Sequence, residues 1–201
     1  MRENRTLIKW VAMVTMIIGN AGYIYDVEML RAIGRVAMPL FAFGIVRGYE
    51  STQSKDRYAM RLLIMGLVAQ PIYMAIFTEG CAPLNPVLGL LTGMLLIESR
   101  RYLGDWVLLS IPVMWIAYMD IYPVLLIVIC YYCRDIVTQS VAMALLTGFR
   151  GLTVNPLCFL SWFAVPILYI NVRVKDMINK YAYYAVYPLH LAVLQGAKWA
   201  L

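Results

Sequence analysis

Nine long apolar segments, separated by short polar connections, follow one another along almost the whole chain. They are Leu7–Tyr25, Ile33–Tyr49, Tyr58–Phe77, Leu84–Ile97, Trp106–Met119, Ile121–Tyr132, Ile136–Phe149, Pro156–Asn171 and Tyr181–Leu201. A helix needs roughly 20 apolar residues to cross a bilayer, and several middle segments are shorter than this. We therefore predict an all-α, polytopic bundle of about nine transmembrane helices, with eight or ten as alternatives if some segments are re-entrant.

The composition excludes a soluble protein. Of the 201 residues, 63% are hydrophobic and only 14% are charged, and the mean hydropathy is +0.73. Since the connections are short, no separate globular domain is expected, and residues 1–201 form a single integral membrane domain. The first segment lacks a small-residue cleavage site, so we interpret it as a retained helix rather than a signal peptide.

The basic residues indicate which side of the membrane each connection faces. With a cytoplasmic N-terminus, thirteen of the seventeen Lys and Arg residues fall on the inner side, as the positive-inside rule requires. These are Arg2, Arg5, Lys9, Arg47, Lys55, Arg57, Arg61, Arg100, Arg101, Arg134, Arg173, Lys175 and Lys180. The net charge of +6 is thus a topology signal. Because it is dispersed over five short connections, a nucleic-acid partner is not expected.

Polar residues at membrane depth fall mostly in the outer half of this topology. They are Asn20, Arg35, Asn85, Asp120, Tyr122 and, about halfway along the last helix, His190. Such residues are costly in a bilayer and normally face a bundle interior, which predicts a shared pocket open to the outer side. The alternative is that outer residues such as Asp26, Glu28 and Arg31 only meet lipid headgroups.

His190 is the single histidine and the best general-base candidate, because Pro188 loosens the helix before it. One histidine does not make a zinc site, and no metal is expected. Cys130 and Cys133 form a C-x-x-C in an apolar segment and are interpreted as hydrophobic residues. Whether Cys81 and Cys158, both on the outer side, form a disulfide is left open.

The inner connection between the second and third segments is rich in cations. Arg47, Lys55, Arg57 and Arg61 flank a polar turn there. They could grip a cytosolic polyphosphate. The alternative is a positive-inside anchor that binds anionic membrane lipids, which explains the same residues.

Two runs of the sequence are specific enough to compare with known families: Gly34-Arg35-Val36-Ala37-Met38-Pro39-Leu40-Phe41-Ala42-Phe43 and Tyr187-Pro188-Leu189-His190-Leu191. With further matches at Asn85 and at Asp120-Ile121-Tyr122, they resemble the TraX family of conjugative-pilin acetylases. The resemblance implies a bacterial inner-membrane enzyme, similar to the acyltransferase-3 superfamily. Such an enzyme acetylates the N-terminal amine of a pilin subunit with acetyl-CoA.

By this resemblance, His190 deprotonates the attacking amine, while Arg35 and Asn85 position or polarise the acyl carbonyl. The cationic inner connection would then hold the CoA phosphates. One departure is that the family's first helix usually carries an Asp-His pair where this chain has Gly19 and Asn20. Two alternatives therefore stay open: head-to-tail cyclisation of pilin without CoA, and a non-catalytic pilin chaperone or assembly factor. The oligomeric state is also open, because Gly44, Gly48, Gly89 and Gly93 suit packing within or between subunits.

Overall fold

The chain folds as an all-helical bundle. The computed structural model describes residues 5–77, 84–110, 120–170, 172 and 180–200, and no strand occurs in these ranges. The elements are α1 (Arg5–Ile24), α2 (Glu28–Gly34), α3 (Ala37–Ser51), α4 (Lys55–Ile76), α5 (Pro86–Leu103), the 3-10 helix η1 (Gly104–Leu109), α7 (Tyr122–Tyr132), α8 (Ile136–Thr153), the 3-10 helix η2 (Pro156–Phe163), α9 (Ala164–Tyr169) and α10 (Lys180–Ala200). Cys81 and the stretch 111–119 of the fifth predicted segment lie outside the described residues.

Polar caps and prolines set where many of these helices begin. Ser54, Asn85, Asp135 and Asn155 each accept a backbone N–H of the following turn with their side chain. Pro86, Pro123 and Pro156 occupy the first turns, where a missing N–H costs nothing. The second predicted segment differs from the structure, because it contains a break between α2 and α3. Arg35 lies at that break.

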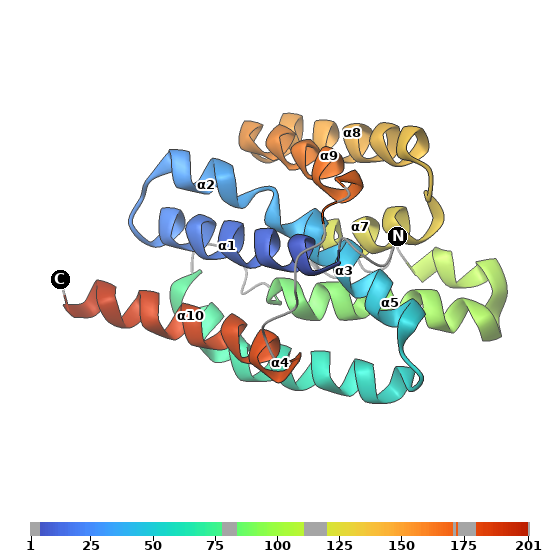
Figure 1. The fold of residues 1–201 in the computed structure, drawn as a ribbon, viewed down its shortest axis with the longest axis horizontal. Helices are drawn as coiled ribbons and strands as arrows, with labels where there is room; N and C mark the ends of the chain where they lie inside the picture. The colour runs from blue at the N-terminus through green and yellow to red at the C-terminus, as the bar shows by residue number, and fades with distance from the viewer. Residues whose placement is uncertain (1–4, 78–83, 111–119, 171, 173–179, 201) are drawn as a thin grey trace.

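The helices pack so that the first and last helices of the chain become neighbours. In Figure 1, α8 and α9 lie along one side of the bundle, α1, α2 and α3 lie in the middle, and α4 and α10 lie along the opposite side. The last helix, α10, packs against both α4 and α1. Buried apolar residues of α3, α4, α5 and α7, such as Leu62, Leu91 and Leu126, form the largest core cluster.

Glycines allow several of these helices to approach closely. A Cβ on Gly48 would meet the Tyr58 hydroxyl at 2.5 Å, and one on Gly93 would meet Ile127 Cβ at 2.9 Å. Gly89 faces Pro123 in the same way, at 3.1 Å. These three glycines therefore serve packing within the chain. Gly44 has no atom within 4 Å of its Cβ position and lines a cavity instead.

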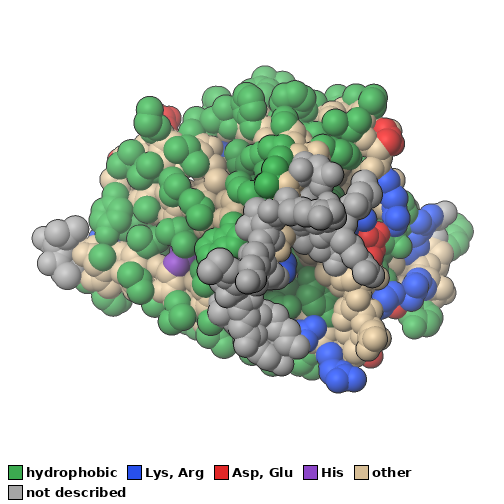
Figure 2. All heavy atoms as spheres, in the orientation of Figure 1, with side chains coloured by type: hydrophobic (Ala, Val, Ile, Leu, Met, Phe, Trp, Pro, Cys, Tyr) green, Lys and Arg blue, Asp and Glu red, His purple; other side chains and the backbone are tan. Residues whose placement is uncertain are grey.

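The described helices have the surface of a membrane protein. Three stretches are long and apolar enough to cross a bilayer: Thr6–Ile24, Glu28–Ser51 and Lys55–Ile76. Apolar side chains cover much of the face in Figure 2, and on α8 the exposed Val141, Leu145 and Phe149 recur at each turn. A surface of this kind is stable against lipid rather than water. The count of about nine spans stays a prediction, since Tyr122–Tyr132 and Pro156–Tyr169 are shorter apolar helices.

Candidate functional site

A cavity of about 450 Å³ lies inside the bundle and follows α1 for most of its length. Ile8 and Lys9 line it near the start of α1, and Asn20 and Tyr23 line it near the end. At 1.5 Å per residue, these positions span roughly 20 Å. Apolar residues of α3 and α4 form much of the wall between them, including Leu40, Phe41, Ile45, Leu62 and Met65. The cavity is thus long, mostly apolar and lined by charged residues at its ends.

One end of the cavity holds a cluster built around Asp120 and Arg150. The Arg150 guanidinium donates to both Asp120 oxygens, at 2.8 Å and 3.0 Å, and it lies over the Tyr122 ring, 4.5 Å from the centroid. Asp120 also accepts the Tyr122 backbone N–H at 3.1 Å. All three residues line the cavity. The structure therefore unites the predicted Asp120 and Tyr122 with Arg150, which is not among the site residues predicted from the sequence.

Two further arginines line the same end. Arg31 pairs with Asp26 and donates to the Gly22 carbonyl at 3.1 Å, so its charge is balanced locally. Arg35, at the α2–α3 break, is half-buried, and no ion pair joins it to a described residue. This end of the cavity therefore presents more positive than negative charge. Such an environment suits a carbonyl, carboxylate or phosphate oxygen better than an ammonium group.

His190 and Asn20 meet where α10 packs against α1. Asn20 Nδ2 is 2.8 Å from His190 Nε2, and His190 Nδ1 is 2.9 Å from the Val186 carbonyl oxygen. A carbonyl only accepts, so Nδ1 carries the ring proton, and Nε2 accepts from the Asn20 amide. His190 is 8% exposed. Asn20 lines the cavity and separates the Nε2 lone pair from it.

Asn85 has a different setting from the other predicted site residues. Its Nδ2 donates to the Gly66 carbonyl at 2.7 Å and to Gln70 Oε1 at 2.9 Å. Its Oδ1 accepts the backbone N–H groups of Val87 and Leu88. Asn85 is fully buried and does not line the cavity. These contacts use both amide hydrogens, so the geometry gives Asn85 a helix-capping role and does not support carbonyl polarisation.

We expect Asn85→Ala to lower the free energy of unfolding by about 2–4 kcal/mol, because it removes a buried cap together with the buried hydrogen bonds to the Gly66 carbonyl and to Gln70 Oε1. The measurement is the thermal unfolding midpoint of the purified protein in detergent. Asp135→Ala is the matched control, since it removes an exposed cap that water replaces. An Asn85→Ala midpoint equal to that of Asp135→Ala would contradict the capping role.

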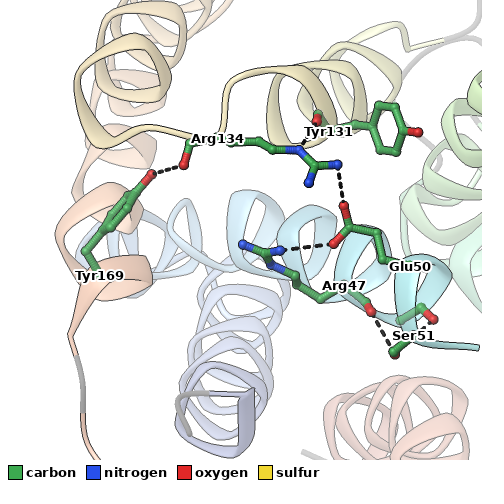
Figure 3. A network of polar contacts seen from close by, with 7 residues as sticks. Arg47, Glu50, Ser51, Tyr131, Arg134 and Tyr169 are labelled. Carbon is green, nitrogen blue, oxygen red and sulfur yellow. Dashed lines mark hydrogen bonds and ion pairs between the residues drawn. The ribbon is translucent and has the colours of Figure 1, made fainter. Parts of the chain in front are cut away.

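At the α3–α4 connection, carboxylates neutralise two of the four predicted phosphate-binding cations. Figure 3 shows Glu50 between Arg47 and Arg134, with N–O distances of 3.0 Å and 2.8 Å. Lys55 donates to Glu98 at 3.1 Å and to the Tyr49 hydroxyl at 3.0 Å, and Tyr49 also donates to Glu98. The sequence count therefore overstates the free charge of this connection.

Arg57 and Arg61, the other two predicted cations, have no ion pair to a described residue. Arg57 is exposed, and its side chain donates to Ser54 Oγ at 3.3 Å. Arg61 packs over the rings of Tyr58 and Tyr184, which line the cavity at the end away from Asp120. Its Nε is buried with no hydrogen-bond partner in the described part of the chain. Arg61 thus lies beside the cavity with an unused donor.

Comparison with known proteins identifies the family. The family described as "TraX protein" matches residues 4–198. The probable fimbrial assembly protein FimC, serogroup H1, of Dichelobacter nodosus is 25% identical over 232 residues, covering 96% of this chain and 95% of the relative. No solved structure matches the chain significantly. Since the family match covers almost the whole sequence, and a relative of full length is named for fimbrial assembly, this chain belongs to the TraX family.

Proposed function

We propose that this protein is a bacterial inner-membrane enzyme that transfers an acetyl group from acetyl-CoA to the N-terminal α-amine of a pilin subunit. Family membership and a relative named for fimbrial assembly support a pilin-related role. In this proposal the chain crosses the membrane about nine times with its N-terminus in the cytoplasm. Figure 2 shows Lys and Arg side chains gathered at one end of the molecule, where Figure 1 places the α3–α4 connection. That gathering agrees with a cytoplasmic face at this end.

The long cavity is the observation that carries the proposal. Acetyl-CoA is made in the cytosol, whereas a pilin N-terminus freed by signal cleavage lies at the outer face. A cavity that follows α1 from Lys9 to Tyr23 gives the two substrates a shared path. The pantetheine arm would enter beside Tyr58 and Tyr184, with Arg57 and Arg61 near the CoA phosphates. The acetyl group would then reach the end that Arg35 and Asp120 line.

The residues near that end account for the proton transfers. The pilin ammonium gives one proton to His190 Nε2 once the Asn20 amide has rotated away, and the neutral amine attacks the thioester carbonyl carbon. Collapse of the tetrahedral intermediate forms the amide and breaks the C–S bond. The departing CoA thiolate takes the proton held by His190, and the second amine proton passes to solvent. Arg35 stabilises the negative oxygen of the intermediate.

The intact mass of the pilin tests this proposal. Pilin purified from cells that carry the protein is expected to be one acetyl group heavier than pilin from cells that lack it. Fragmentation is expected to place that group on the N-terminal residue. A loss of one water would instead indicate head-to-tail cyclisation, and equal masses with fewer assembled pili would indicate a non-catalytic assembly factor. Either result would overturn the acetylation proposal.

A further inference from the structure

Tyr122 places an unused hydroxyl group at the charged end of the cavity. It is the first residue of α7, it lines the cavity, and it is 6% exposed. Its hydroxyl is buried and makes no hydrogen bond of standard geometry in the described part of the chain, although the Ser161 side chain, which also lines the cavity, lies close enough to interact with it. A buried hydroxyl without a partner costs free energy. A group held in this way is available to a ligand that enters the cavity.

The position of this phenol is fixed by its neighbours. Asp120 accepts the backbone N–H of Tyr122, and the Arg150 guanidinium covers one face of the ring at 4.5 Å. Asp120 in turn accepts both arms of the Arg150 fork, so Arg150 has little freedom to move toward a ligand. The Tyr122 ring therefore lines the cavity from a rigid support, with its hydroxyl buried in the cavity wall.

Arg35 supplies a second donor in the same cavity. It lines the cavity and has no ion pair to a described residue. Arg31 and Arg150, by contrast, are each paired with an aspartate. A neutral O–H donor and an unbalanced guanidinium that line one cavity can together stabilise a carbonyl oxygen as it becomes negative. Asn85 does not fill this role, because its amide hydrogens are engaged by Gly66 and Gln70.

We propose that the Tyr122 hydroxyl and the Arg35 guanidinium together bind the oxygen of the acyl carbonyl, forming the oxyanion site of the enzyme. This inference rests on the proposed acetyl transfer. As the pilin amine attacks, the carbonyl π electrons move onto the oxygen, and Tyr122 and Arg35 donate hydrogen bonds to it. When the C–S bond breaks, the carbonyl re-forms and both donors are released unchanged.

Tyr122→Phe tests the inference because it removes one oxygen atom and leaves the ring under Arg150. Acetyl transfer to pilin, followed by intact mass over time, is expected to fall about 10²–10³-fold. The thermal unfolding midpoint is expected to stay the same or rise, since the lost hydroxyl had no described partner. Tyr169→Phe is the control. Its hydroxyl donates to Gln139 Oε1 at 2.7 Å outside the cavity, so transfer is expected to proceed normally.

A second measurement separates this inference from the proposed function. Saturation-transfer NMR with sodium acetate reports whether a small carboxylate contacts the protein. Wild type and Tyr169→Phe are expected to transfer saturation to the acetate methyl group. Tyr122→Phe is expected to lose most of this saturation-transfer signal. If pilin mass never changes but this pattern holds, acetylation fails and the oxygen-binding site stands. If Tyr122→Phe binds acetate or transfers acetyl groups as wild type does, the oxyanion site is overturned.

Discussion

His190→Gln is expected to reduce acetylation of pilin by about 10²–10⁴-fold, because glutamine keeps hydrogen-bonding atoms but does not take up a proton. His190 is the only histidine of the chain, and its Nε2 is the only one of its two nitrogens with a lone pair. The acetylated fraction of pilin, measured by intact mass at equal amounts of membrane-inserted protein, checks this result. Normal acetylation by His190→Gln would remove His190 from the mechanism.

Asn20 provides a second arm of the same test. In Asn20→Asp, a carboxylate faces Nε2. Because a carboxylate only accepts hydrogen bonds, it stabilises the form of His190 in which both ring nitrogens carry a proton. Such a ring has no lone pair, and acetylation is expected to fall as in His190→Gln. Asn20→Ala leaves Nε2 free toward the cavity and is expected to keep most of the activity. Equal activities of Asn20→Asp and Asn20→Ala would contradict the assignment of the Nε2 lone pair as the base.

The helices could be predicted from the sequence because apolar length and polar caps are local signals. Each of the nine predicted segments coincides with at least one helix over its described residues. The break between α2 and α3 at Arg35 could not be predicted, because the apolar pattern from Ile33 to Tyr49 is continuous enough to indicate one helix. The number of spans is harder to predict. Helices such as α7 are too short to cross a bilayer of ordinary thickness alone.

The contacts of the candidate site depend on packing, which local patterns do not contain. Asn20 and His190 are 170 residues apart and meet only because α10 packs against α1. Asp120 and Arg150 are separated by 30 residues, and no spacing rule pairs them. The pairing of Arg47 with Glu50 could have been foreseen, because residues three apart share a helix face. The pairing of Lys55 with Glu98 could not.

Gly19→Ala is expected to lower the free energy of unfolding by about 1–3 kcal/mol, because α1 and α2 cross with almost no space between their backbones. A Cβ on Gly19 would lie 2.5 Å from Gly34 Cα, and one on Gly34 would lie 2.3 Å from Gly19 Cα. Backbone atoms do not rotate away as a flexible side chain does. The two helices would have to separate, and Arg35 at the end of α2 would move with them.

The thermal unfolding midpoint in detergent measures this effect, with Gly196→Ala in α10 as the control. No atom lies within 4 Å of the Cβ position of Gly196, so alanine there is expected to be neutral or to stabilise by up to about 1 kcal/mol. Equal midpoints for the two variants would show that α1 and α2 do not cross this closely. The same contact favours glycine at position 19, because any side chain there meets the backbone of Gly34. Glycine at this position therefore accompanies the close packing of the two helices, and the next residue along α1, Asn20, is the one whose side chain faces His190 Nε2.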